Sequence, residues 1–249
     1  YLFAGGESTA ATARSVDFDG TDDKLTWAAT SDFTFGTGAY TVEYWIYYDS
    51  VQNDDVIFTQ YTDQNGGFVI YNNTSKVAIN KFSIGDVLAY NTAPTAGVWT
   101  HYAFVRESTG TDKTYIFVNG ELKQTGTDDT DWNLTQISAL GGNAHPTSSQ
   151  YTNCKISNFR IVKGTAVYTS SFRPPTEPLT NITNTKLLCC NNSSTTGSTV
   201  TPGTITAVSS PTASTDSTFD DPAGFVFGDK EGIIKCGSYV GNGSSTGPE

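Results

Sequence analysis

The sequence predicts an all-β protein built as a two-sheet antiparallel jelly-roll sandwich. Apolar and polar residues alternate along many short segments, and this period of two is typical of strands. Turn-forming clusters separate the segments at short intervals, and no window of a dozen residues has the 3.6-residue period of an amphipathic helix. Only 16% of the residues are charged whereas 12% are aromatic, a composition that favours strands with a polar, uncharged surface.

The expected strands begin near the start of the chain. Residues 15–19 alternate apolar and acidic side chains, which indicates a strand with one buried face. Residues 40–48 carry aromatic side chains on both faces, so this strand is expected to be covered on both sides. Asn119 and Gly120 both tolerate positive φ and predict a hairpin turn after a strand. The other expected strands are 56–60, 68–71, 76–82, 101–106, 114–118 and 155–162.

The domain organisation is expected to change near residue 191. Residues 1–190 are assigned to the jelly roll. Residues 191–222 are rich in Ser, Thr, Pro and Gly and predict an exposed, extended connector. Residues 223–249 have strand character but are too few to bury a core, so they are expected to open a further, truncated β domain. The absence of Met agrees with a piece of a longer protein.

Charge and hydropathy exclude two classes of partner. With 14 basic and 25 acidic side chains the formal net charge is −11, and such a surface repels phosphate backbones. Nucleic acid is therefore not expected as a partner. No apolar run approaches the ~18–20 residues of a membrane span, so membrane insertion is not expected either.

The four cysteines do not have the spacing of a metal site. Buried free thiols are favoured over a disulfide framework, because a chain of this length can bury its own core. Cys189 and Cys190 are adjacent and would point to opposite faces of a strand. At most one of them is therefore expected to join Cys154 in the core.

No catalytic constellation is visible, so the chain is not expected to be an enzyme. A glycosidase on a β-sandwich needs two carboxylates, and the E-x-D-x-x-E spacing of laminarinase-like sandwiches is absent. Glu43, in the middle of a predicted strand, is expected to face a Lys or Arg on a neighbouring strand. His101 is interpreted as a hydrogen-bonded histidine of the sheet. Residues 243–247 match G-x-S-x-G, but no His follows them.

Clusters of aspartates are the candidate metal sites. Ca²⁺ takes about six to eight oxygen ligands. Asp22 and Asp23 crowd one turn, and Asp54 and Asp55 crowd another. Neither turn has the D-x-D-x-D-G calcium loop, and aspartates also cap turns through their own backbone. Calcium is therefore a candidate ligand at these residues, and no other cofactor is expected.

Five residues are candidates for sugar binding. Aromatic rings that stack on pyranose rings, flanked by amides, are typical of sugar recognition by β-sandwiches. The candidates are Trp132, Asn143, His145, Gln150 and Tyr151, of which the last four lie in or at the end of the loop at 141–151. For Trp132 the alternative is a ring that fills the core at the edge of a strand.

Several segments together resemble known jelly rolls. Residues 16–25 look like an opening strand and turn, and residues 32–47 look like an aromatic central strand. Paired later strands and a closing strand are found at 99–106, 115–120 and 186–189. As a set, these segments resemble the laminin-G-like, concanavalin A-like domains over residues 14–190, which implies their fold. Neither a calcium-ligand set nor a catalytic acidic motif carries over, so lectin activity does not follow from the fold.

A narrower resemblance concerns the segments 156–168, 172–175 and 178–179. They are similar to the jelly rolls in virion proteins of tailed bacteriophages, including those of cyanobacteria, and residues 233–244 resemble a β domain that follows in such proteins. This resemblance implies a virion structural protein on the particle surface, foremost a homo-oligomeric tail-fibre or host-attachment component. Its partners would be other virion proteins and a cell-surface glycan. The alternatives are a capsid-surface decoration protein, a glycan-active enzyme and a cellular adhesin.

Overall fold

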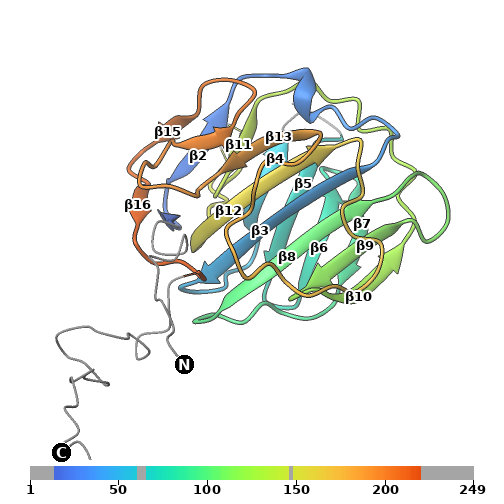
Figure 1. Ribbon diagram of the computed structural model, residues 1–249, viewed down its shortest axis with the longest axis horizontal. Coiled ribbons are helices and arrows are strands. Elements are labelled where there is room, and N and C mark those ends of the chain that lie inside the picture. The colour runs from blue at the N-terminus through green and yellow to red at the C-terminus, as the bar shows by residue number, and fades with distance from the viewer. Residues whose placement is uncertain (1–13, 61–65, 146–147, 220–249) are drawn as a thin grey trace, which may run out of the picture.

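A computed structural model describes residues 14–60, 66–145 and 148–219. Within these ranges the chain forms two antiparallel sheets, of nine and seven strands, stacked face to face (Figure 1). The one helical element described is a 3-10 turn, η2 (Ser31–Phe33). The predicted all-β sandwich is confirmed. The further β domain predicted for residues 223–249 lies outside the described residues.

The nine-stranded sheet is at the front of Figure 1. Its strands run in the order β10 (Glu121–Gly126), β9 (Thr114–Val118), β8 (Trp99–Arg106), β3 (Tyr40–Tyr48), β12 (Asn153–Lys163), β1 (Ser15–Asp19) and β16 (Thr212–Ser214). The sheet is completed by β13 (Thr185–Cys189), which pairs with β12, and by β14 (Ser198–Val200), which pairs with β13. The predicted hairpin turn joins β9 to β10, and both of its residues have positive φ, 49° at Asn119 and 73° at Gly120.

The seven-stranded sheet lies behind the first. Its strands run in the order β15 (Thr206–Val208), β2 (Lys24–Trp27), β11 (Ser138–Leu140), β4 (Asp55–Gln60), β5 (Phe68–Asn73), β6 (Lys76–Lys81) and β7 (Gly85–Tyr90). The strands β2, β7, β10 and β11 were not among those expected from the sequence. All of them are short or partly exposed, so they lack a clear alternation of apolar and polar residues.

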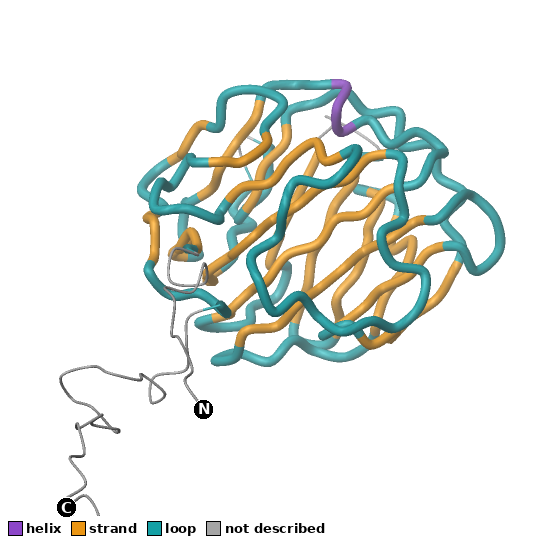
Figure 2. The backbone as a smooth tube through the Cα atoms, in the orientation of Figure 1, coloured by secondary structure: helices purple, strands orange, loops and turns teal. Residues whose placement is uncertain are grey.

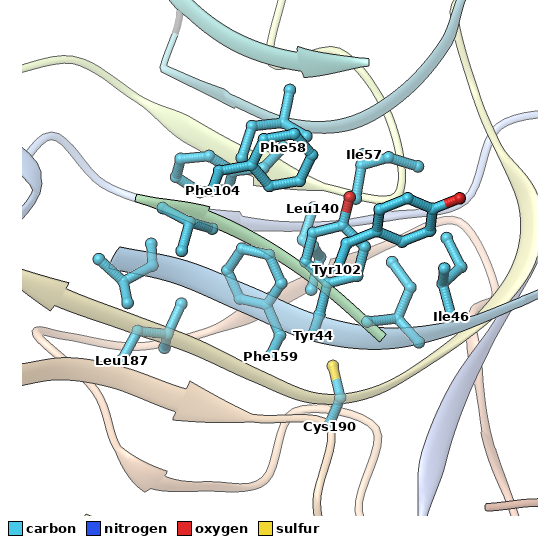
Figure 3. Close-up of a cluster of buried hydrophobic side chains, with 14 of the residues drawn as sticks. Tyr44, Ile46, Ile57, Phe58, Tyr102, Phe104, Leu140, Phe159, Leu187 and Cys190 are labelled. Carbon is cyan, nitrogen blue, oxygen red and sulfur yellow. The ribbon is translucent and has the colours of Figure 1, made fainter. Parts of the chain in front are cut away.

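The main core fills the space between the sheets (Figure 3). The ring of Tyr44 on β3 stacks on that of Phe159 on β12, with 5.7 Å between the ring centroids. Phe159 in turn meets Phe58 of the opposite sheet, at 5.4 Å between centroids. Aromatic pairs at such distances add to the free energy gained by burying their surface. This core fixes the separation and the relative orientation of the two sheets.

A second apolar layer covers the outer face of the nine-stranded sheet. The loop that joins β12 to β13 crosses this face in Figures 1 and 2. Tyr168 and Phe172 of the loop stack on each other and pack against Ala103 and Phe117 of the sheet. This cover explains why β3 is buried along nearly its whole length, as its aromatic residues on both faces predict.

A β-bulge in β12 changes which side chains face the core. Ile156 points inward, so strict alternation would also point Arg160 into the core. Instead, Asn158 adopts φ 53° and the pairing register shifts between Ser157 and Arg160. The extra residue reverses the alternation, so that Phe159 lies in the core and Arg160 on the outer face.

The segment predicted as a connector, 191–222, contributes three short strands to the sheets within its described part. β14 pairs with β13, β15 with β2, and β16 with β1. The segment is extended and largely exposed, as its composition predicts, but it is not a free linker. Short polar strands at a sheet edge gain backbone hydrogen bonds without an apolar pattern, which is why composition alone does not reveal them.

The described cysteines are free and buried, as predicted. The expectation that only one of Cys189 and Cys190 joins Cys154 in the core is wrong, because all three are core residues. Cys190 has φ 56°, just beyond the end of β13. This turn of the backbone breaks the alternation and directs both side chains inward, with 3.7 Å between their sulfur atoms. Cys236 lies outside the described residues.

Candidate functional site

A hollow of about 230 Å³ lies on the outer face of the seven-stranded sheet. We call it the outer hollow, and its lining residues are Asp54, Val56, Val69, Tyr71, Asn80, Phe82, Ser83, Asn143 and Gln150. Ligand pockets for drug-sized molecules span about 300–1,000 Å³. The outer hollow therefore suits a single small ring or a comparable group.

The pleat of β4, β5 and β6 builds the floor of the outer hollow. Val56 lies opposite Tyr71, and Val69 lies opposite Asn80, in the register of these strands. Side chains two residues apart share a face of the sheet, so Val69 and Tyr71 project together on β5. Ile70, between them, points into the core. The result is an apolar floor bordered by polar groups.

The loop that connects β11 to β12 forms one wall of the outer hollow. Its backbone closes on itself, because the Asn143 amide donates to the Gln150 carbonyl at 3.0 Å. The side chains of the same two residues are also joined, with Asn143 Nδ2 donating to Gln150 Oε1 at 2.8 Å. Thr59 Oγ1 accepts from the Ala144 amide at 2.9 Å and ties the loop to the sheet. These contacts fix Asn143, Ala144 and Gln150 relative to one another and to the sheet.

A polar group on β5, β6 and β7 forms the opposite border. The Asp86 carboxylate accepts hydrogen bonds from Tyr71 Oη at 2.8 Å and from Asn80 Nδ2 at 2.9 Å. It also pairs with Lys76. Burial opposes ionisation of Asp86, but the hydrogen bonds from Lys76, Asn80 and Tyr71 prevail and lower its pKa. The contacts fix the orientation of the Tyr71 ring, which is half-buried at the hollow.

Lys24 contacts the loop that forms the wall of the outer hollow. Its ammonium donates to the Asn143 carbonyl at 2.9 Å and lies 5.6 Å from the centre of the Tyr151 ring. Burial lowers the pKa of Lys24. The lysine and Tyr151 therefore position the loop that carries Asn143 and Gln150.

The structure separates the candidate metal ligands Asp54 and Asp55. Asp54 is exposed, lines the outer hollow and has φ 65°. Asp55 is fully buried, and its Oδ2 accepts from the Gln52 amide at 2.8 Å and from Asn72 Nδ2 at 3.1 Å. Burial raises the pKa of Asp55. The two aspartates thus differ in exposure, and calcium binding at Asp54 and Asp55 stays a prediction.

The other aspartate turn brings three carboxylates together. Asp22 and Asp23 lie with Asp19, and one oxygen from each falls within 4.8 Å of the others. Several of these oxygens already accept backbone hydrogen bonds: Asp19 Oδ1 accepts from the Thr21 amide at 2.8 Å, and Asp23 Oδ1 accepts from the Ser210 amide at 2.7 Å. Such contacts are what a turn-capping role requires. Calcium binding at Asp22 and Asp23 stays a prediction.

Of the five candidate sugar ligands, Trp132 is the clear exception. It is fully buried, its ring meets Phe68 edge-on at 5.0 Å, and its Nε1 donates to Asp128 Oδ2 at 2.8 Å. The ring of Trp132 fills the core, which is the alternative that the sequence left open. Trp132 therefore cannot stack on a ligand. The backbones of Trp132 and Gly36 exchange two hydrogen bonds, and this isolated β-bridge directs the tryptophan side chain inward.

The remaining four candidates share the loop at the outer hollow. Asn143 and Gln150 line the hollow itself. The half-buried Tyr151 lies against Lys24, and the amide of the half-buried His145 donates to Asn143 Oδ1 at 3.0 Å. Sequence reasoning did not select Tyr71, Asn80 and Phe82, which also line the outer hollow. The alternation of apolar and polar residues in 68–71 and 76–82 could have identified these three residues, because it places their side chains on the outward face of the sheet.

The fold is a two-sheet antiparallel β-sandwich with a small hollow on the outer face of one sheet. Residues 19–167 match the Laminin_G_3 family, described as the concanavalin A-like lectin/glucanases superfamily. The chain belongs to this family.

Solved structures share the fold at low sequence identity. A heptameric SAP-like pentraxin from Limulus polyphemus is 12% identical with a TM-score of 0.55, over 82% of this chain and 95% of that one. A candidate carbohydrate-binding protein from Bacteroides ovatus is 14% identical with a TM-score of 0.55, over 85% of this chain and 61% of that one. Domain 4 of an arabinanase from Geobacillus stearothermophilus, in complex with arabinotriose, is 19% identical with a TM-score of 0.47, over 61% of this chain and 72% of that one.

The comparison with curated protein sequences gave no match. Among the described residues there is no helix long and apolar enough to cross a membrane.

Proposed function

We propose that this chain is a carbohydrate-binding module of a tailed-bacteriophage virion protein, displayed on the particle as part of a tail fibre or host-attachment component. The observation that carries the binding proposal is the outer hollow, where the half-buried rings of Tyr71 and Phe82 lie beside amide and carboxylate groups.

The chemistry of the outer hollow fits a sugar. A pyranose ring has an apolar C–H surface and a rim of hydroxyls, so it needs apolar contact together with directed hydrogen bonds. Tyr71, Phe82 and the valine floor supply the apolar contact, and Asn80, Gln150 and Asp54 supply polar groups. The shared fold with a candidate carbohydrate-binding protein agrees with this proposal.

Binding rather than hydrolysis is proposed for this site. Most glycosidases use two carboxylates that flank the scissile bond. Asp54 is the one acidic residue among the described residues that line the outer hollow. The neighbouring Asp86 is paired with Lys76 and accepts hydrogen bonds from Tyr71 and Asn80. With its pKa lowered, Asp86 is unsuited to act as a general acid.

The virion assignment rests on the likeness of residues 156–179 to the jelly rolls of phage virion proteins. Those residues form β12 and the covering loop, which buries the outer face of the nine-stranded sheet. Assembly as a homo-oligomer with other virion proteins is part of this proposal. The acidic, mostly uncharged polar surface suits a particle-surface protein.

The experiment measures retention of the protein on immobilised cell-surface polysaccharides, with release of reducing sugar followed in parallel. We expect retention without sugar release, and loss of retention in Tyr71→Ala. The matched control is Tyr47→Ala, because Tyr47 is also half-buried beneath a lysine, Lys155, but lies on the other sheet. Equal retention of Tyr71→Ala and the unmodified protein would contradict the binding proposal.

A separate observation tests the virion proposal. Antibodies raised against this chain are expected to label the tail region of purified phage particles in electron micrographs. Labelling of the capsid surface would favour the decoration protein instead. Labelling of cellular surfaces without particles would overturn the virion assignment.

A further inference from the structure

We propose that the outer hollow selects sugars that carry an acetamido group, such as N-acetylated amino sugars, over sugars with a hydroxyl or an amine at the same position. This inference rests on the proposed carbohydrate-binding function and specifies its ligand. It is carried by three features of the outer hollow: an apolar floor, and a hydrogen-bond acceptor and an amide donor that have no partner among the described residues.

The floor of the outer hollow is apolar. Val56 and Val69, which are 2% and 7% exposed, line the hollow together with the half-buried Phe82. Valine side chains neither donate nor accept hydrogen bonds. A hydroxyl placed over them would lose its hydration without compensation, whereas a methyl group would gain apolar contact. The floor therefore favours a ligand with a projecting methyl.

Asp54 supplies the acceptor. Its carboxylate makes no hydrogen bond or ion pair with the part of the chain that the structure describes, although it lines the outer hollow. An ionised carboxylate can only accept hydrogen bonds. Its φ of 65° is a left-handed turn conformation that aspartate adopts more readily than most residues. An amide N–H is a suitable donor for it.

Gln150 supplies the donor. Its Oε1 accepts from Asn143 Nδ2 at 2.8 Å and from Ser148 Oγ at 3.3 Å, so the amide orientation is set. Its Nε2 has no partner among the described residues and belongs to a side chain that lines the outer hollow. An acetamido group presents one N–H, one carbonyl and one methyl. The carboxylate, the Gln150 amide and the valines match these three parts.

The same features disfavour acidic sugars. A ligand carboxylate would face Asp54 in a molecule whose formal net charge is −11. Lys76 pairs with Asp86 and Lys24 donates to the Asn143 carbonyl, so both of these lysines already have partners. Uronic acids are therefore expected to bind more weakly than neutral acetamido sugars.

The test compares matched methyl glycosides by titration and protein NMR. The probes are N-acetylglucosamine against glucose and glucosamine, and N-acetylgalactosamine against galactose. At least one acetamido sugar is expected to bind about tenfold more tightly than its parent sugar, in the range that a well-placed small group supplies. Asp54→Gly is expected to reduce this preference, and it should fold because its backbone already has a glycine-like φ.

The control variant is Asp112→Gly. Asp112 is also exposed and has a positive φ, 54°, but lies in the turn between β8 and β9 of the other sheet. It is expected to keep the full preference. If each acetamido sugar binds no more tightly than its parent sugar, the inference is overturned. The proposed function still stands in that case if polysaccharide retention depends on Tyr71. Tighter binding of glucosamine would also overturn it, because Asp54 would then be pairing with an amine. Absence of binding by every glycoside overturns the inference as well.

Discussion

Arg160 and Glu43 face each other across β12 and β3 on the outer face of the nine-stranded sheet. Arg160 Nε and Nη2 donate to Glu43 Oε1 at 2.9 and 2.5 Å, and both side chains are almost fully buried. The second carboxylate oxygen, Oε2, accepts from Tyr168 Oη at 2.9 Å and lies 3.3 Å from His101 Nε2. The pair confirms the expectation that Glu43 faces a basic residue, and that His101 is a hydrogen-bonded sheet histidine.

The buried pair predicts a large loss of stability in Arg160→Met. Removal of the guanidinium leaves the Glu43 charge buried without its cation, which costs about 3–5 kcal/mol in comparable cases. Urea denaturation is expected to show this loss. The control is Lys113→Met, because the Lys113–Glu107 pair is exposed and contributes little. Similar stabilities of the two variants would show that the buried contact is not needed.

A pH dependence follows from the same cluster. Burial opposes ionisation of Glu43, but the His101 hydrogen bond and the Arg160 charge lower its pKa below the ordinary value of 4.5. A lowered carboxylate pKa stabilises the folded state above the unfolded pKa, and this stabilisation is lost as pH falls through the folded pKa. The melting temperature of the unmodified protein should therefore exceed that of Glu43→Gln at pH 7, and the gap should narrow below pH 4.5. A gap that widens on acidification would contradict this assignment.

Two glycines with the same backbone conformation should respond differently to alanine. Gly141 and Gly164 have φ 82° and 85°, so each alanine carries the cost of a left-handed backbone, about 1–2 kcal/mol. A Cβ at Gly141 would lie 2.4 Å from Phe18 Cδ1, whereas a Cβ at Gly164 meets nothing within 4 Å. Gly141→Ala should therefore lose about 1–3 kcal/mol more than Gly164→Ala. Equal denaturation midpoints would show that the close approach is relieved by movement of Phe18.

The strands β15 and β16 predict a pattern of hydrogen exchange. Because they pair with β2 and β1, amides in Thr206–Val208 and Thr212–Ser214 that donate across these ladders should exchange more slowly than those of residues 193–196. Mass spectrometry after brief deuterium labelling measures this difference. Uniformly fast exchange from residue 191 to residue 219 would contradict this pairing and favour the exposed, extended connector that the composition predicts.

Much of the fold could be predicted because alternation is a direct consequence of burying one face of a strand. The central strand at 40–48 and the hairpin turn at Asn119 were predictable from the sequence. The bulge at Asn158 was not, since it depends on a single positive φ that only the packing of Phe159 and the pairing of Arg160 determine.

The candidate site was predictable only in part. The loop residues Asn143 and Gln150 were found by their chemistry, and the structure places them at the outer hollow. Tyr71 and Asn80 come from different strands, and nothing in a single strand shows which neighbour it pairs with. Trp132 has the right chemistry for sugar stacking, but a two-way backbone bridge to Gly36 carries it into the core.

The most direct test of the account is to map where sugar binds. Fragments of a retained cell-surface polysaccharide would be titrated into ¹⁵N-labelled protein while backbone amide shifts are followed. We expect the largest changes around Asp54, Tyr71, Asn80 and Gln150, with the amides around Trp99 on the other sheet unchanged. Shift changes that leave the outer hollow untouched and gather on the nine-stranded sheet would contradict the central claim.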